Sequence, residues 1–139
     1  MVNEKWIRKR YPHMSKEEAQ IWTDFLKTFE IPFLKIEYDV HLGEGIPPKP
    51  GEPEWLVRLK RAITRKRVDA IAETEEDIWI FEVKPRIGMS ALGQLLTYYE
   101  LYMEEYSPEK PIMLAAVGRR KEPDIDGAFE LYAVNIFLV

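Results

Sequence analysis

The middle of the chain most constrains the fold, because two strand-like runs are followed by a helix-like run and then by an apolar run. Residues 66–73 and 78–84 are strand-like segments on either side of a polar turn at 74–77, which predicts a β-hairpin. Residues 90–105 are expected to form a helix, and residues 112–117 are a continuous apolar run typical of a buried strand. A helical crossover of this kind predicts that the strands at 78–84 and 112–117 lie parallel in one sheet.

The N-terminal third supplies a helix, a strand and a loop. Ser15 and Glu18 have the spacing of a capping box and predict a helix that begins there and runs to about Phe29. Residues 34–42 alternate apolar with polar side chains, which predicts a strand with one buried face. Residues 43–53 contain four prolines and three glycines and are therefore expected to form a loop, which could close over a groove.

The remaining segments are less tightly constrained. Residues 55–63 fit either a short helix or an extension of a strand, and residues 123–127 are expected to form a turn before a final strand at 129–139. The expected core face of the helix at 90–105 consists of large apolar residues, namely Leu92, Leu95, Leu96, Tyr99 and Met103. The order α-β-β-β-α-β-β predicts an α/β fold with a central mixed sheet flanked by helices.

Length and composition fit one domain, 1–139, with one core, since the chain has 139 residues of which 46% are hydrophobic. The chain has no cysteine, which excludes disulfides, thiolate zinc sites and thiolate-bound iron–sulfur clusters. No apolar run approaches the ~20 residues that span a bilayer, and the N-terminus is unlike a signal peptide. We therefore expect a cytoplasmic protein without a membrane partner.

Basic residues are clustered although the net charge is −4. One cluster leads directly into Asp69 and contains Arg58, Lys60, Arg61, Arg65, Lys66 and Arg67. Two further clusters lie at residues 5–10 and 119–121. Such local clusters can bind the phosphates of a nucleic acid on a protein that is acidic overall. The alternative is that each cluster is a solvated face with no ligand.

Three charged residues on the predicted hairpin are candidates for chemistry. Glu82 and Lys84 are two residues apart on a strand, so their side chains leave the same face, and Asp69 can lie opposite them on the neighbouring strand. Two carboxylates on adjacent strands suit a hard cation such as Mg²⁺, which also retains several waters. The alternative interpretation is a cross-strand salt bridge on a solvated face of the sheet.

These residues, taken with Gln94 and Tyr98, resemble the PD-(D/E)xK nuclease superfamily, whose fold is the restriction-endonuclease-like fold. In that superfamily an Asp lies on the second strand and Glu-x-Lys on the third, matched here by Asp69 and by Glu82 to Lys84. The RecB-like branch adds Gln-x-x-x-Tyr on the following helix, matched by Gln94 and Tyr98. The resemblance covers residues 15–118, and the cysteines of the iron–sulfur members are absent.

The resemblance implies roles for particular residues. Asp69, Glu82 and the main-chain carbonyl of Val83 would bind Mg²⁺ or Mn²⁺, and Lys84 would act on the attacking water. An acidic residue on the first helix assists in many members, and Glu18 is the candidate here, although the capping box also explains it. The basic residues Arg58, Arg61, Arg65, Lys66 and Arg67 would bind the phosphate backbone.

Two functions remain open at this stage. The first is a metal-dependent nuclease that hydrolyses phosphodiester bonds in DNA. The alternative is an inactive module of the same fold that binds nucleic acid or assembles with a larger complex. The chain could also form a homodimer, in which the apolar residues 134–139 would pair across the interface.

Overall fold

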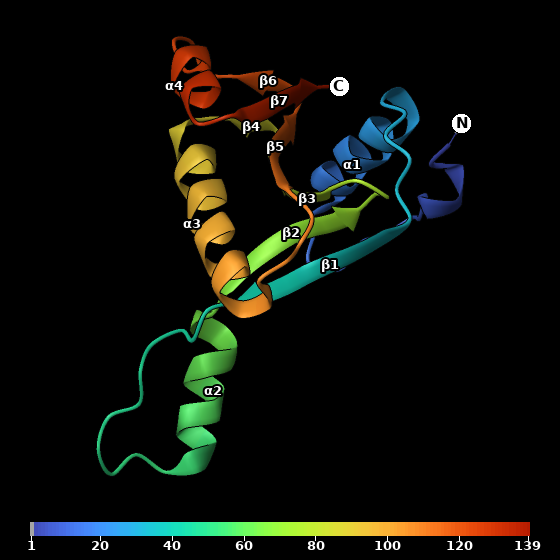
Figure 1. Cartoon of the computed structure of the whole chain (residues 1–139). Helices are drawn as coiled ribbons and strands as arrows, with labels where there is room; N and C mark the ends of the chain where they lie inside the picture. Colours follow the sequence, from blue (N-terminus) through green and yellow to red (C-terminus); the bar gives the residue numbers. More distant parts are fainter. Residues whose placement is uncertain (1) are drawn as a thin grey trace.

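The structure is a computed structural model that describes residues 2–139. A short 3-10 helix at Glu4–Trp6 precedes the main elements. In chain order these are α1 (Lys16–Thr28), β1 (Lys35–Leu42), α2 (Glu54–Thr64), β2 (Lys66–Glu73), β3 (Ile78–Val83), β4 (Arg86–Ile87), α3 (Met89–Tyr106), β5 (Ile112–Gly118), β6 (Arg120–Lys121), α4 (Asp126–Leu131) and β7 (Val134–Leu138). Figure 1 shows their arrangement.

The central sheet has the strand order β1-β2-β3-β5-β7. β1, β2 and β3 are antiparallel neighbours, whereas β3, β5 and β7 run parallel. The predicted mixed sheet and the predicted parallel pairing after the helical crossover are therefore confirmed. The short strands β4 and β6 form a second, two-stranded sheet.

Helices cover both faces of the central sheet, and each face has its own core. On one face α1 packs Trp22 and Phe25 against Phe81 of β3. On the other face α3 packs Leu95 against Ile80, and Phe129 of α4 joins the same cluster. The capping box predicted for α1 is present, because Ser15 accepts the N–H of Glu18 and Glu18 accepts the N–H of Ser15. Within residues 2–139, every helix is too short or too polar to span a lipid bilayer.

Three local features differ from the sequence-based expectations or settle them. Residues 55–63 lie in the helix α2, so the strand alternative is wrong. The expected strand at 129–139 is shorter, because residues 126–131 form α4 and the strand begins at Val134. Tyr99 and Met103 are exposed rather than in the core, since the sheet-facing side of α3 carries Ala91, Leu95 and Tyr98.

α2 and the loop before it form an arm that projects from the body of the molecule (Figure 1). None of the residues of α2 is buried. The base of the arm is fixed by Arg65, whose guanidinium donates to the carbonyls of Gly43, at 2.7 Å, and His41, at 3.0 Å. The predicted loop at residues 43–53 thus forms one side of a projecting arm, on the side of the molecule where β1 ends and β2 begins.

Candidate active site

The sheet separates into two parts beside the last residues of β3. β2 and β3 are paired from Glu73–Ile78 to Ala70–Phe81, and their pairing stops there. β2 continues beside β1, whereas β3 continues beside β5 through Glu82 and Val83. Asp69 is the residue before Ala70, and Glu82 is the residue after Phe81. Both therefore lie next to the last β2–β3 pair, at the point where the strands separate.

A change of face in the β1–β2 pair accompanies this separation. Tyr38 and Ala70 belong to the core on the α1 side, whereas Val40 and Val68 belong to the core on the α3 side. Strict alternation along a strand would place both pairs on one face. Asp39 lies between them with φ 51°, a left-handed conformation that rotates the strand at the level of Asp69.

The Asp69 carboxylate takes the place of the missing strand pairing. Its Oδ2 accepts a hydrogen bond from the main-chain N–H of Val83 at 2.8 Å. Burial raises the pKa of Asp69 and the charge of Glu18 raises it further, whereas the Val83 N–H, Lys84 and His13 lower it. The net direction is upward, so a single main-chain donor does not compensate this carboxylate for the loss of water.

Glu82 is still more deeply enclosed, since only 6% of the residue is exposed. Burial raises its pKa, and the charge of Asp69 raises it further, while Lys84 and the Tyr98 hydroxyl act in the opposite direction. The Lys84 ammonium is 4.0 Å from Oε1 of Glu82. Oε2 has no hydrogen-bond partner within residues 2–139. A buried carboxylate oxygen without a donor is costly, and a cation would relieve that cost.

α3, which covers one face of the sheet, places Gln94 and Tyr98 beside the carboxylates of Asp69 and Glu82. Gln94 and Tyr98 are four residues apart and therefore lie on one face of the helix. The pKa of Tyr98 is raised by burial and then by the charges of Glu82 and Asp69. Oε1 of Gln94 is another buried oxygen without a partner in the described part of the chain. The structure thus brings together Asp69, Glu82, Val83, Lys84, Gln94 and Tyr98, all of which the sequence had singled out.

Glu18 has two roles in the structure. Its Oε1 accepts the N–H of Ser15 at 2.8 Å, which caps α1. Its charge also raises the pKa of both Asp69 and Glu82, so it lies on the site's side of α1. The third predicted acidic residue is therefore near the carboxylate pair while its own carboxylate holds a helix cap.

His13 is a neighbour of the site that the sequence reasoning missed. Its charge lowers the pKa of Asp69 and of Asp39. The chain's two histidines, His13 and His41, lack the spacing of metal ligands, so their spacing does not select His13. The signal that could have found it is its place two residues before Ser15, at the same end of α1 as Glu18.

The five predicted phosphate-binding residues do not share one environment. Arg65 is bound to main-chain carbonyls at the base of the arm, and Arg67 makes two hydrogen bonds to Asp39, at 2.9 and 2.8 Å. Arg58, Arg61 and Lys66 are exposed on or beside α2. Two of the five side chains therefore already serve the structure, and three remain accessible.

A different basic surface lies beside the start of α1. A hollow of about 520 Å³ is lined by Lys9, Arg10 and Lys16 together with Tyr11, Met14, Ser15 and Ala19. The ion pairs within residues 2–139 leave these three cations without a carboxylate partner. We call this surface the basic hollow. It lies at the same end of α1 as Glu18 and His13, whose charges act on Asp69.

The residues present fit a hard divalent cation. Within residues 2–139, no group of three or more histidine and acidic side chains is arranged to hold a metal ion. Mg²⁺ nevertheless needs only one or two carboxylates, because it keeps several of its waters. The orphaned Oε2 of Glu82, next to Asp69, supplies the donor chemistry that such an ion takes.

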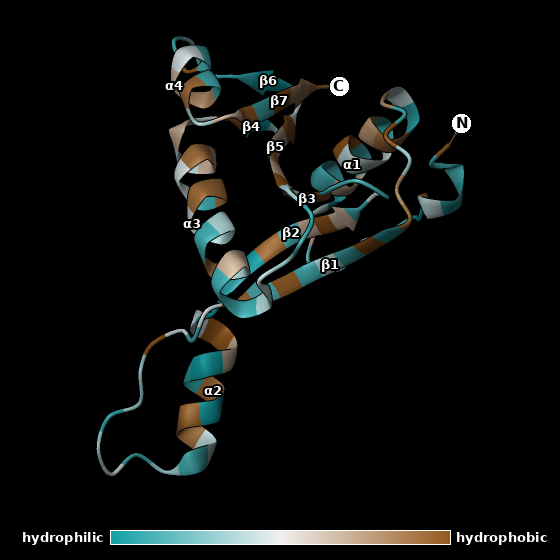
Figure 2. Ribbon diagram, viewed as in Figure 1, coloured by the Kyte–Doolittle hydropathy of each residue, from teal (hydrophilic) through white to brown (hydrophobic). Residues whose placement is uncertain are grey.

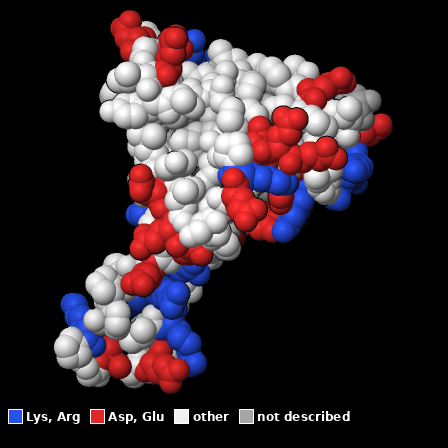
Figure 3. All heavy atoms as spheres, viewed as in Figure 1, with Lys and Arg blue, Asp and Glu red and all other residues white. Residues whose placement is uncertain are grey.

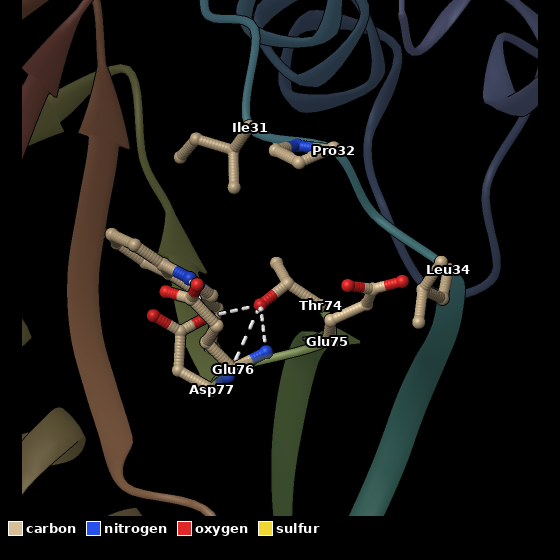
Figure 4. Close-up of a pocket in the computed structure, with 8 residues that line it drawn as sticks. Ile31, Pro32, Leu34, Thr74, Glu75, Glu76 and Asp77 are labelled. Carbon is tan, nitrogen blue, oxygen red and sulfur yellow. Dashed lines mark hydrogen bonds between the residues drawn. The ribbon is translucent and has the colours of Figure 1, made fainter.

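Another hollow, of about 450 Å³, lies at the turn between β2 and β3, away from these residues (Figure 4). Ile31, Pro32 and Leu34 form one side, and residues 74–77 with Trp79 form the other. The Thr74 hydroxyl donates to the Asp77 carboxylate and accepts hydrogen bonds from the N–H groups of Glu76 and Asp77. The hydrogen-bonding capacity of this hydroxyl is therefore used within the turn. This hollow contains none of the predicted site residues.

No protein-family model matches the sequence, and no curated protein is significantly similar to it. The fold is similar to that of a repair endonuclease from Pyrococcus abyssi, with a TM-score of 0.50 and 16% identity over 95% of this chain and 49% of that chain. A complex of EndoMS with double-stranded DNA gives a TM-score of 0.49 and 16% identity over 95% of this chain and 48% of that one.

The chain thus spans about half the length of the solved proteins that it matches. At this level of identity the likeness concerns the fold. The predicted restriction-endonuclease-like core, a central mixed sheet with helices on both faces, is confirmed.

Proposed function

We propose that the chain is a metal-dependent nuclease that hydrolyses phosphodiester bonds in DNA. The observation that carries the proposal is the carboxylate pair of half-buried Asp69 and buried Glu82, which stands where the sheet separates and has one Glu82 oxygen without a donor within residues 2–139. The similarity of fold to a repair endonuclease supports the same reaction class. Asp69 and Glu82, with the carbonyl of Val83, would hold Mg²⁺ or Mn²⁺, which when bound stabilises developing negative charge and acidifies a water.

The chain's own residues have distinct tasks in this proposal. Lys84 carries the positive charge nearest to Glu82 and donates hydrogen bonds to the attacked phosphate or to the attacking water. Tyr98 and Gln94 form the α3 wall of the site and position the backbone of the substrate. Their spacing after Glu82 and Lys84 supports assignment to the RecB-like branch.

The nucleic acid would approach along the basic hollow. Lys9, Arg10 and Lys16 are cations without carboxylate partners, and they flank the end of α1 that carries Glu18. Phosphate contacts of this kind position a nucleic acid without reading its sequence. Arg58 and Arg61 on the arm, with Lys66 at the start of β2, are a second candidate for the same task.

The alternative, an inactive module that binds nucleic acid, is favoured by two observations. Glu18 is engaged in the α1 cap, and no three-residue metal cluster exists within residues 2–139. A binding module would retain affinity for DNA without any response to metal.

Thermal unfolding with and without Mn²⁺, followed by a cleavage assay, separates the two functions. A ligand that binds only the folded state raises the unfolding midpoint. We expect Mn²⁺ to raise the midpoint of the wild type and to leave that of Glu82→Gln unchanged. Labelled single-stranded and duplex DNA should then be cut by the wild type only. DNA binding without metal-dependent stabilisation or cleavage would instead favour the inactive module.

A further inference from the structure

α2 carries an apolar stripe that the rest of the chain leaves uncovered. Trp55, Leu59 and Ile63 are spaced by four residues and therefore lie on one face of the helix. Trp55 is 62% exposed and Ile63 is 67% exposed. Figure 2 shows hydrophobic residues along the projecting arm. We call these three residues the arm stripe.

The arm stripe calls for a partner on energetic grounds. An isolated helix as short as α2, with 11 residues, is marginal in water and gains most of its stability from packing. Within residues 2–139 the preceding loop packs on one side of α2, where Lys60 pairs with Glu52 at 3.0 Å. Leu56 and Val57 are half-buried, and no residue of the helix is fully buried. The opposite side faces solvent in the single chain.

α3 carries a second apolar stripe along its whole length. Its members alternate steps of three and four residues, which is the 3.5-residue repeat of helices that pack on other helices. They are Met89, Leu92, Leu96, Tyr99, Met103 and Tyr106. The helix already packs Ala91, Leu95 and Tyr98 on the sheet, and Leu92 and Leu96 are partly buried against the same core. The exposed members of the stripe are Met89, Tyr99, Met103 and Tyr106. In Figure 3 the surface over the N-terminal part of α3 is almost free of charged side chains, whereas acidic side chains gather near its C-terminal end.

The two stripes are flanked by opposite charges. All charged residues of α3 are acidic, and they lie in its C-terminal half at Glu100, Glu104 and Glu105. α2 carries Arg58, Lys60 and Arg61 against the single acidic residue Glu54. A basic apolar helix and an acidic apolar helix in the same chain are therefore complementary in charge as well as in hydrophobicity.

Within one chain the two stripes do not meet. The C-terminal ends of α2 and α3 adjoin at a hollow lined by Arg61, Arg65, Leu101 and Glu104, among others. From this junction α2 extends away from the body rather than back along α3 (Figure 1). The anchoring of Arg65 to Gly43 and His41 holds that direction.

We propose that two copies of the chain form a two-fold symmetric dimer in which the arm of each copy packs on α3 of the other. The arm stripe would contact Tyr99, Met103 and Tyr106 of the second copy, and Arg58, which flanks the stripe, would face its Glu100. Two-fold symmetry makes the two contacts identical, so the arm stripe of each copy is covered by α3 of the other. No stripe is left to bind a third copy, and assembly therefore stops at the dimer. This dimer differs from one formed through residues 134–139, and it does not depend on the proposed nuclease activity.

Engineered cysteines test the arrangement directly, because the chain has none of its own. Leu59→Cys and Met103→Cys are purified separately, mixed, and treated with a short bis-maleimide. The expected result is a covalent dimer in the mixture, with little in either protein alone. Cross-linking of Met103→Cys alone, or of Leu59→Cys alone, would show a contact between like helices and overturn the proposal. Absence of any covalent dimer in the mixture would overturn it as well.

Light scattering of uncross-linked protein supplies the second measurement. The wild type is expected at twice the chain mass of 16.4 kDa, and Leu59→Asp at the mass of one chain. Leu131→Asp is the matched control, because Leu131 is 77% exposed on α4, outside both stripes, and that variant should remain a dimer. A monomeric wild type would contradict the proposal, and so would a dimeric Leu59→Asp.

Discussion

At the scale of single residues, the burial of Glu82 distinguishes a candidate active site from a salt bridge. In a structural ion pair on a solvated sheet face, the carboxylate would be exposed to water and would lie within hydrogen-bond distance of its cationic partner. Glu82 is instead buried, its distance to Lys84 is 4.0 Å, and one of its oxygens has no donor within residues 2–139. The alternative of a solvated cross-strand salt bridge therefore does not fit the geometry of Glu82.

The first prediction concerns the pH dependence of stability in metal-free protein. Because the folded state raises the pKa values of Asp69 and Glu82, it binds protons more tightly than the unfolded chain does. Their contribution to stability is therefore complete at low pH and is lost as pH rises above about 4, the usual range for carboxyls, through the raised values. Glu82→Gln should stabilise the metal-free protein by on the order of 2 kcal/mol near neutral pH.

Urea unfolding of both proteins across this pH range measures the effect. The difference between Glu82→Gln and the wild type should grow with pH and shrink when Mn²⁺ is added to the wild type. Glu17→Gln is the control, because Glu17 is an exposed residue of the same helix turn as Glu18. A constant difference at all pH values would contradict the prediction.

A second prediction at this scale concerns Lys84. Replacing it by Met removes the cation that would stabilise charge on the phosphate, and losses of about 10²–10³-fold in rate are usual for such groups. The metal-dependent rise in unfolding midpoint should survive, because Asp69 and Glu82 remain. Single-turnover cleavage with Lys27→Met as the exposed control measures the loss. Full activity in Lys84→Met would remove Lys84 from the mechanism.

The sequence predicted which candidate residues come together better than it predicted what surrounds them. Asp69, Glu82, Lys84, Gln94 and Tyr98 were found because each stands at a fixed place on an element whose order was clear. His13 was not found, because its proximity to Asp69 depends on how the chain before α1 packs. The double use of Glu18 was foreseen in part, since the capping box was visible in the sequence.

At the scale of elements, α3 shows where periodicity misleads. Leu92, Leu96, Tyr99 and Met103 repeat as a core face would, and Leu92 and Leu96 are indeed partly buried against the core. Tyr99 and Met103 are nevertheless exposed, and the fully buried positions are Ala91, Leu95 and Tyr98. Hydrophobicity marks a surface for burial without saying what buries it. The apolar pattern of residues 55–63 likewise fitted both a helix and a strand. No other element within residues 2–139 buries that segment, so packing gave no basis for choosing between the two.

The third prediction compares two basic elements. Lys9→Ala/Arg10→Ala/Lys16→Ala removes the cations of the basic hollow, and Arg58→Ala/Arg61→Ala/Lys66→Ala removes the same charge from the arm. Binding of a labelled oligonucleotide in Ca²⁺ should weaken much more in the first variant. Its slope of log affinity against log salt should fall by about 2, since each phosphate contact contributes roughly 0.7–0.9. Equal weakening of both variants would assign the phosphates to both surfaces.

At the scale of the whole molecule, the body and the arm are separate in their contributions to folding. The two cores lie on the faces of the sheet, and no residue of α2 is buried in either. β1 and β2 are antiparallel neighbours up to Leu42 and Lys66, which are directly paired. The chain between these two residues therefore spans a gap that a two-residue hairpin turn could close.

The last prediction follows from this separation. A variant in which Asn-Gly replaces residues 43–65 keeps the register of β1 and β2 and both cores. Its free energy of unfolding should lie within about 1–2 kcal/mol of the wild type, because the lost arm contacts are partly offset by the lower entropy cost of a shorter loop. Mn²⁺ should still raise its unfolding midpoint, since Asp69 and Glu82 lie outside the arm. Light scattering should find one chain where the wild type has two. An unfolded variant would instead make the arm part of the folding unit, and a dimeric one would place the contact between copies elsewhere on the body.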